Sequence, residues 1–129
     1  MSNYLVTGAA GFIGAAVAQN LINQGNKVVT VDNLTTGFRE AIPDGVQFIK
    51  GDCQDPKTIA SLQPFKFDAI LHIAGQSSGE ISYDDPLYDL QTNTQSTLLL
   101  LKLALKTDCR KFIYAGTMSV YGDHPNKPI

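Results

Sequence analysis

Three glycines, Gly8, Gly11 and Gly14, recur at every third residue in the stretch VTGAAGFIG (residues 6–14), where an apolar run gives way to a helical pattern. A strand that leads directly into a helix aims the free N–H groups and positive dipole end of that helix beyond the turn, where a phosphate can bind. Gly8 would allow the tight turn, Gly11 would let a pyrophosphate approach, and Gly14 would let the helix lie close to the strand. The alternative is a glycine-rich turn with a purely structural role.

An acidic residue follows at a spacing that favours the phosphate-binding interpretation. Asp32 stands 18 residues after Gly14, at the end of the β-rich run VVTVDN. A carboxylate there can accept hydrogen bonds from both ribose hydroxyls of an adenosine, and its charge would repel a 2′-phosphate. The sequence therefore predicts dinucleotide binding with a preference for NAD over NADP. Arg39 would argue for NADP, but we interpret it as a solvated surface residue.

The elements that must position these residues alternate between short β-rich runs and helical patterns, which is typical of a parallel sheet with helices on its faces. Helices are expected after the glycines, at about residues 56–62 and from the Asp85-Pro86 pair onward. Strands are expected at residues 4–7, 27–31, 47–50, 69–73 and 111–115. The doubly wound dinucleotide fold has the strand order 3-2-1-4-5-6. We therefore predict an α/β, Rossmann-like doubly wound parallel sheet, truncated to about five strands in the order 3-2-1-4-5.

The last predicted helix is rich in leucine, and its apolar residues reach nearly all round its C-terminal half. One face can pack on the sheet, while the rest is either covered by the fold itself or lies at a subunit interface. The apolar block TLLLLKLALK (residues 97–106) is interrupted by Lys102 and is far shorter than the about 20 residues of a membrane span. One face carries the leucines Leu87, Leu90, Leu98, Leu101 and Leu105.

The composition fits one domain over residues 1–129, with 43% hydrophobic residues and a formal net charge of −2. The ten basic residues are scattered, which argues against nucleic acid or an anionic membrane as a partner. Cys53 and Cys109 have neither metal-ligand nor C-x-x-C spacing. We therefore expect no metal, a reduced cytoplasmic setting, and core positions for both cysteines. No signal-peptide pattern opens the chain.

Several stretches together resemble the extended short-chain dehydrogenase/reductase family, in particular its NAD-dependent sugar-nucleotide epimerases and dehydratases. The resemblance covers the whole chain and implies the NAD-binding portion of an enzyme that transiently oxidises a sugar hydroxyl. A DP pair before a long helix that contains Asn93 adds to it. The matching stretches are TGAAGFIG (7–14), VDNLTTG (31–37), GDCQD (51–55), HIAGQSSGEIS (72–82) and GTMSVYG (116–122).

The resemblance assigns the adenosine half of the cofactor to the ends of the first three predicted strands. Phe12 and Ile13 would lie beside the pyrophosphate, and Asp32 and Asn33 would hold the adenosine ribose. Asp52 and Cys53 would border the adenine, with Asp52 accepting from its exocyclic amine. From the residues alone, Asp52 would be interpreted as a turn carboxylate.

The nicotinamide half falls at the end of the fourth strand. Ala74, Gly75 and Gln76 would lie where a crevice opens between the first and fourth strands, and Gly75 would let the nicotinamide come close. His72 lies within an apolar strand, and we interpret it as a hydrogen-bonded core histidine in preference to a catalytic one. Thr117 matches a family position whose hydroxyl binds the reacting sugar oxygen, and its alternative role is to cap the backbone at a strand end.

The family's catalytic base is a tyrosine, and a lysine four residues later lowers the pKa of its phenol. None of the five tyrosines in the sequence has a lysine at that spacing. The resemblance therefore predicts an incomplete NAD-binding domain, without the Tyr-x-x-x-Lys segment and the substrate domain, that is inactive alone. A sugar nucleotide is the expected partner of the full-length parent.

The alternative function is a non-catalytic module that binds NAD or forms oligomers. The fifth predicted strand, KFIYAG (residues 111–116), would be an edge with unpaired backbone groups, and such edges pair readily with other chains. We therefore expect a homo-oligomer or association with a missing C-terminal fragment.

Overall fold

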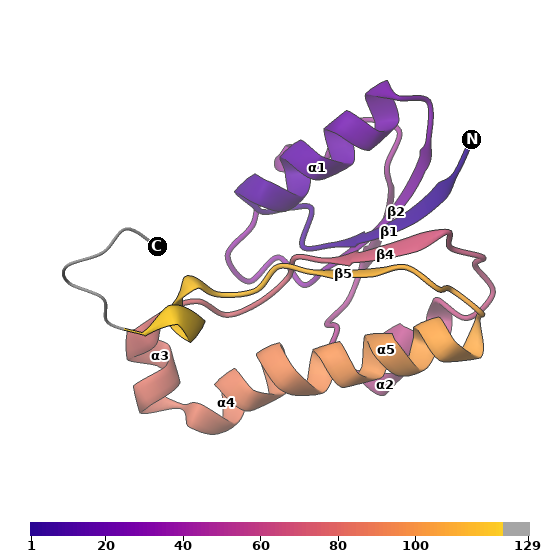
Figure 1. The fold of residues 1–129 in the computed structure, drawn as a ribbon. Coiled ribbons are helices and arrows are strands. Elements are labelled where there is room, and N and C mark those ends of the chain that lie inside the picture. The colour runs from indigo at the N-terminus through magenta and orange to yellow at the C-terminus, as the bar shows by residue number, and fades with distance from the viewer. Residues whose placement is uncertain (123–129) are drawn as a thin grey trace.

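The computed structural model describes residues 1–122 and forms a five-stranded parallel sheet with helices on both faces (Figure 1). The spatial order is β3-β2-β1-β4-β5, and every neighbouring pair is parallel. This order and direction confirm the predicted sheet, and the strand bounds differ from the prediction by at most one residue at either end. The strands are β1 (Asn3–Thr7), β2 (Lys27–Asp32), β3 (Gln47–Lys50), β4 (Ala69–His72) and β5 (Phe112–Tyr114).

The helices divide between the two faces of the sheet (Figure 1). Helix α1 (Phe12–Asn23) covers one face. Helices α2 (Pro56–Ser61), α4 (Pro86–Leu90) and α5 (Ser96–Lys106) lie on the other. This arrangement brings the carboxyl ends of β1, β2 and β4 to one edge, which is where open α/β sheets bind their ligands.

Each face of the sheet has its own apolar core, because successive side chains of a strand point to opposite sides. Val6 of β1 packs with Ala18 of α1, whereas its neighbour Leu5 packs with Leu100 of α5. Both cysteines belong to the second core and are buried, as predicted. The burial of these side chains from water is the main force that holds the helices on the sheet.

Helix α1 can begin immediately after the glycine-rich turn because the glycines let the backbone of the helix touch the backbone of the turn. A Cβ atom on Gly14 would lie 2.1 Å from the carbonyl oxygen of Gly8. Gly8 itself has a φ of +77°, a left-handed conformation that side chains disfavour. The first turn of α1 therefore rests directly on the end of β1.

The segment predicted as one helix after Asp85 contains a wider turn in its middle. Asp85 caps α4 by accepting from Tyr88 N at 3.0 Å, and Pro86 occupies the first turn, as predicted. A π-helical turn, η2 (Gln91–Gln95), then separates α4 from α5. Such turns are rare and are frequent at functional sites.

Three short helices were not predicted from the sequence. Helix α3 (Gly79–Asp84) is capped by the hydroxyl of Ser78, which accepts from Ile81 N at 3.4 Å. The 3-10 helices η1 (Arg39–Ala41) and η3 (Met118–Tyr121) follow β2 and β5. All three span six residues or fewer, too short for a helical period to show in the sequence.

The leucine-rich helix packs on the sheet through Leu100 and Leu103, which are buried. The five leucines that the sequence spacing singled out take no part in this packing, and we call them the leucine stripe. All of its members are exposed, from 39% for Leu101 to 84% for Leu105: Leu87, Leu90, Leu98, Leu101 and Leu105. Within residues 1–122, no helix combines the length and apolar character needed to span a membrane.

The contact beneath Gly14 generates a stability test. Gly14→Ala places a methyl group against backbone atoms that cannot turn aside, so we expect the free energy of unfolding to fall by about 3 kcal/mol. Gly79→Ala is the matched control, because nothing lies within 4 Å of its Cβ position and alanine favours a helix. Urea denaturation would measure both, and equal stability of the two variants would contradict the close packing.

Candidate functional site

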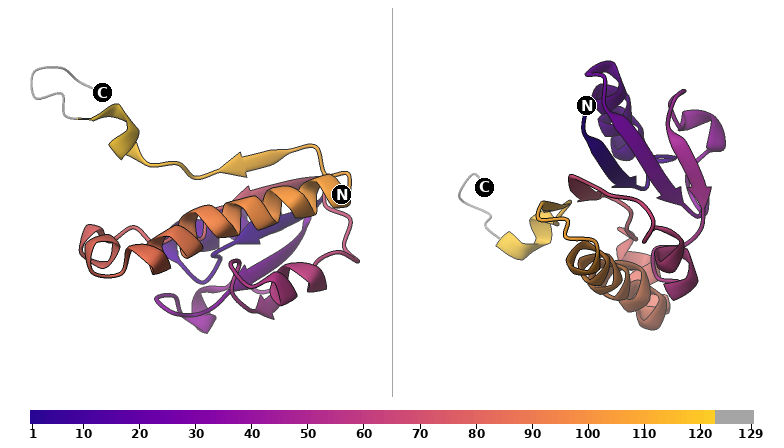
Figure 2. Two further views of the ribbon diagram at one scale, coloured as in Figure 1. Left: turned by 90° about the horizontal axis from the view of Figure 1, so that it is seen from below. Right: turned by 90° about the vertical axis from the view of Figure 1, so that its right-hand side faces the viewer.

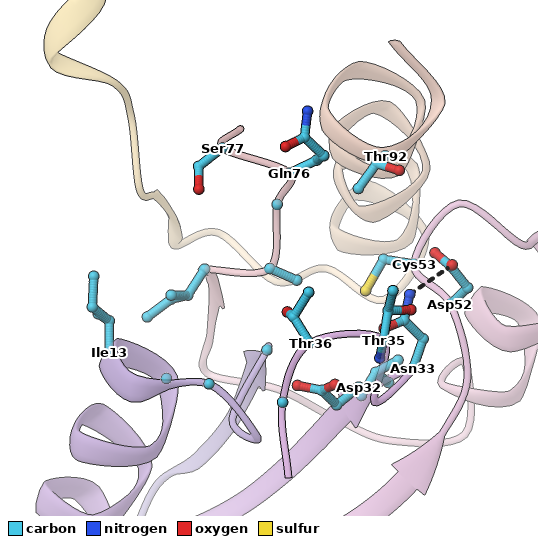
Figure 3. A pocket seen from close by; sticks show the side chains of 18 of the residues that line it. Ile13, Asp32, Asn33, Thr35, Thr36, Asp52, Cys53, Gln76, Ser77 and Thr92 are labelled. Atoms are coloured by element: carbon cyan, nitrogen blue, oxygen red, sulfur yellow. Dashed lines mark hydrogen bonds between the residues drawn. The ribbon is translucent and has the colours of Figure 1, made fainter. Parts of the chain in front are cut away.

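A cavity of about 520 Å³ opens at the carboxyl ends of the strands, between the glycine-rich turn and the loop after β4 (Figure 3). We call it the crevice. Its lining includes every residue that the sequence analysis assigned to the cofactor: Gly8, Gly11, Phe12, Ile13, Gly14, Asp32, Asn33, Asp52, Cys53, Ala74, Gly75 and Gln76. Residues from four separate parts of the chain therefore meet in one space.

The glycine-rich turn forms one wall of the crevice. Gly8 N donates to Val31 O at 2.9 Å and Gly11 N donates to Gly8 O at 3.1 Å, so the turn is fixed by its own backbone. Gly11 is the N-cap of α1 and no side chain caps the helix there. The side chain of Phe12 is 94% exposed beside this helix start. The N-terminus of α1 thus has the geometry and dipole that suit an anion.

Asp32 ties this wall to the next loop. One of its carboxylate oxygens accepts from Ala10 N at 3.0 Å, and the other accepts from Leu34 N at 2.8 Å. Leu34 has a φ of +61°, which is uncommon for a residue with a branched side chain, and the bond to Asp32 helps to hold it there. Each oxygen keeps a second lone pair with which it can accept from a ligand hydroxyl.

Asn33 and Asp52 join the ends of β2 and β3. Asn33 Nδ2 donates to Asp52 Oδ2 at 2.9 Å, which is the dashed line in Figure 3. Asp52 also accepts from Gln54 N at 3.1 Å. Asp52 therefore acts as the turn carboxylate expected from the sequence and also lines the crevice.

Cys53 lines the crevice beside Asp52 as a neutral thiol. Burial, together with smaller contributions from the nearby charges of Asp52 and Asp32, raises its pKa to about 12. A thiol that stays protonated is a poor nucleophile. Its sulfur therefore contributes an apolar surface to this part of the wall.

The opposite wall is the loop after β4, and Thr7 holds it in place. The buried hydroxyl of Thr7 accepts from Ile73 N at 3.0 Å and from Ala74 N at 3.1 Å. A Cβ atom on Gly8 would lie 2.9 Å from Ala74 Cα, so the two walls touch at the base of the crevice. Thr7, at the end of β1, thus fixes the position of Ala74 and Gly75.

His72 continues this network into the core and is hydrogen-bonded there, as predicted. Because Thr7 Oγ1 accepts from two amides, its own hydrogen is directed to His72 Nδ1, 2.8 Å away. The other nitrogen, Nε2, then carries a hydrogen and donates to Ser96 Oγ at 3.2 Å. Burial lowers the pKa of His72 to about 4, so the ring is neutral.

The crevice also contains hydroxyl side chains that the sequence analysis did not assign: Thr35, Thr36, Ser77, Ser78, Tyr88 and Thr92. Thr35 and Thr36 belong to the stretch VDNLTTG, whose motif was a signal for them. Thr92 comes from η2, and its Oγ1 is buried without a hydrogen-bond partner among the described residues. A buried hydroxyl without a partner is costly, so Thr92 is a candidate ligand contact.

Thr117 does not line the crevice. It is the N-cap of η3, and its hydroxyl accepts from Ser119 N at 3.1 Å. This is the capping role that the sequence analysis weighed against a catalytic one, and the catalytic role stays a prediction. Within residues 1–122, no three His, Cys, Asp or Glu side chains gather as metal ligands would.

A family model described as the NAD dependent epimerase/dehydratase family matches residues 4–129. The chain belongs to this family. It is 36% identical over 128 residues to the UDP-glucose 4-epimerase of Streptomyces lividans, a match covering 98% of the chain and 39% of that protein. It is 37% identical over 130 residues to that of Mycolicibacterium smegmatis, covering 96% and 42%. The family predicted from the motifs is therefore confirmed.

Solved structures of the family superpose on the chain. The UDP-glucose 4-epimerase of Thermus thermophilus, in complex with NAD, has a TM-score of 0.91 at 34% identity, covering 98% of the chain and 41% of that structure. The enzyme of Thermotoga maritima with UDP-glucose gives a TM-score of 0.91 at 34% identity, covering 97% and 41%. The chain spans about two fifths of the length of the relatives it matches.

The neutral state of His72 makes stability depend on pH. The folded protein holds the pKa of His72 at about 4, below its ordinary value of 6.5, so the unfolded chain binds more protons between these values. We expect the contribution of His72 to be constant above pH 6.5 and to fall by about 3 kcal/mol as the pH drops to 4. Urea denaturation from pH 7.5 to 4 would measure it.

The control for this test is His72→Gln, which cannot take up a proton in this range. The variant is less stable throughout because it loses the fitted ring, but its stability has a shallower slope between pH 6.5 and 4. Parallel curves for the two proteins would show that His72 is not held neutral.

Proposed function

We propose that the chain is the NAD-binding portion of a sugar-nucleotide epimerase or dehydratase. NAD supplies the hydride acceptor with which such enzymes transiently oxidise a sugar hydroxyl. One observation carries the proposal: an uncapped helix start and Asp32 line the same crevice, joined by the hydrogen bond from Ala10 N to Asp32. The family and the NAD complex of the similar Thermus thermophilus enzyme support it.

The residues around the crevice suit the two halves of this cofactor. We place the pyrophosphate at the start of α1, next to Phe12 and Ile13, where backbone amides and the helix dipole favour its charge. Asp32 and Asn33 accept from the adenosine ribose. Asp52 and Cys53, with a carboxylate and an apolar thiol, border the adenine.

The loop after β4 takes the nicotinamide half in this proposal. Ala74 and Gly75 line the crevice on the side that Thr7 fixes, and Gly75 presents no side chain to the ligand. Thr92 Oγ1 also lies at the crevice, is buried and has no hydrogen-bond partner within residues 1–122, so it can form a hydrogen bond with the cofactor.

The charge of Asp32 makes NAD the preferred dinucleotide. A 2′-phosphate on the ribose would lie against this carboxylate, and like charges at that distance repel. Arg39 would have to neutralise the phosphate, but its guanidinium lies over the ring of Phe48, 4.8 Å from the centroid. Arg39 is therefore already engaged in a cation–π contact away from the crevice lining.

Turnover requires a proton acceptor that these 129 residues do not supply. No tyrosine in the sequence is followed four residues later by a lysine, which is the pair expected for the family. The hydroxyl of Thr117 accepts from Ser119 N and keeps its own hydrogen, which it can donate to a sugar oxygen. For this chain alone we therefore propose cofactor binding without turnover, in a cytoplasmic setting that keeps Cys53 and Cys109 reduced.

A second function, association, is favoured by the exposed leucine stripe. The five leucines of the stripe, from α4 and α5, are exposed, and β5 pairs with β4 on only one of its edges. Figure 2 shows β5 at the margin of the sheet. Exposed apolar side chains and an open strand edge each favour binding of another chain. We propose that the chain forms homo-oligomers through the leucine stripe.

Calorimetric titration with NAD and with NADP tests the main proposal. We expect NAD to bind at least about tenfold more tightly than NADP, and Asp32→Ala to weaken NAD binding at least about tenfold while narrowing this difference. Asp44→Ala removes another carboxylate outside the crevice and is expected to change neither affinity. Equal affinity of the unmodified chain for both dinucleotides would remove the role given to Asp32.

Sedimentation velocity tests the association. We expect the unmodified chain to sediment as a dimer or larger species, and Leu98→Glu with Leu105→Glu to sediment as a monomer because charge in an apolar contact is costly. Gln19→Glu on α1, on the other side of the sheet, is the control. A monomer at all concentrations of the unmodified chain would disprove the proposal.

A further inference from the structure

Gln76 lines the crevice through its position in the loop after β4, but its side chain is directed elsewhere. In Figure 3 its amide group points away from Asp32 and Thr36. Gln76 Oε1 accepts from Ser78 N, and Nε2 lies 3.0 Å from Ser78 O. The side chain therefore stabilises the loop, and what it contacts determines the shape of this wall.

Asn93 of η2 forms two hydrogen bonds with the backbone of Gln76. Asn93 Oδ1 accepts from Gln76 N at 2.8 Å, and Asn93 Nδ2 donates to Gln76 O at 2.8 Å. Asn93 Oδ1 would also lie 3.1 Å from a Cβ atom on Gly75, so it closes the space behind that residue. The loop is thus held by Thr7 on the side of β1 and by Asn93 on the side of η2.

Asp89 of α4 joins these contacts. Its Oδ1 atom accepts from Gln76 Nε2 at 2.7 Å, from Ser82 Oγ at 2.7 Å and from Asn93 Nδ2 at 3.1 Å. A carboxylate can only accept, so it forces both amides to turn their NH₂ groups toward it. The carbonyl oxygens of Gln76 and Asn93 must then face Ser78 N and Gln76 N, as observed.

We propose that Asp89 is a positioning residue for the cofactor, which fixes the loop of Ala74, Gly75 and Gln76 through the amides of Gln76 and Asn93. Asp89 does not line the crevice, so it acts only through these partners. The inference rests on the proposed function, because it assigns the loop to the nicotinamide half of NAD. Three donors directed at one charged acceptor make strong bonds, which suits a rigid wall.

The test compares NAD affinity in the unmodified chain and in two variants of Asp89. Asp89→Leu keeps the approximate size and removes the acceptor, and we expect the dissociation constant for NAD to rise about tenfold. Asp89→Asn can keep a carbonyl oxygen toward the three donors, so we expect it to restore most of the affinity. Asp84→Leu changes an exposed aspartate in α3 and is the matched control, with unchanged affinity.

Two further readouts separate positioning from general stability. The thermal midpoint of each variant without ligand shows whether the fold is intact, and titrations are made well below it. In ¹H–¹⁵N spectra we expect the amide resonances of Gly75 and Gln76 to move in Asp89→Leu and to return toward their original positions in Asp89→Asn. Should Asp89→Leu fail to fold, Ser82→Ala removes one donor from the same oxygen and is expected to raise the dissociation constant by a smaller factor.

The outcomes distinguish this inference from the function on which it rests. No binding of NAD to the unmodified chain would overturn the proposed function and the inference with it. Binding to the unmodified chain that is equally tight in Asp89→Leu would overturn the inference alone. A loss of affinity that Asp89→Asn shares in full, or that Asp84→Leu reproduces, would also overturn it, because the acceptor oxygen would then not be the cause.

Discussion

Around Gly8 the backbone of one segment lies directly against the backbone of another, and this contact sets the positions of α1 and of the loop after β4. The carbonyl of Gly8 supports Gly14 in the first turn of α1, and the Cα of Gly8 faces Ala74 across the base of the crevice. Only residues without a side chain permit both approaches at once. The start of α1 and the ends of β2 and β4 therefore converge on one space, which is what a ligand with a charged linkage between two rings requires.

Polar contacts with fixed directions set the shape of that space. Asp32 joins the glycine-rich turn to the loop after β2. Thr7 holds the loop after β4 through its hydroxyl, which also forms a hydrogen bond with the neutral ring of His72. Low dielectric strengthens such bonds inside a protein, and a missing partner there is costly. These contacts hold the walls of the crevice by the chain's own groups, and walls held in this way lower the entropic cost of binding.

The sequence predicted the parts of the site that depend on short spacings along the chain. The glycines and Asp32 each follow a strand end, and strand ends of a parallel sheet meet at one edge, so all twelve residues assigned to the cofactor line the crevice. The hydrogen bonds of Gln76 with Asp89 and Asn93 join residues that are 13 and 17 positions apart in the sequence. Neither these bonds nor the π-turn could be predicted from the periodicity of the sequence. The leucine spacing showed an apolar face, but only packing decides whether a helix buries that face.

A crystal structure of the chain with NAD would show where the cofactor binds. We expect the pyrophosphate at the N-terminus of α1, with its oxygens in hydrogen-bond reach of the amides beside Gly11, and the adenosine ribose hydroxyls on the carboxylate of Asp32. An adenosine placed away from β2, or a pyrophosphate that leaves the start of α1 without an anion, would contradict this placement.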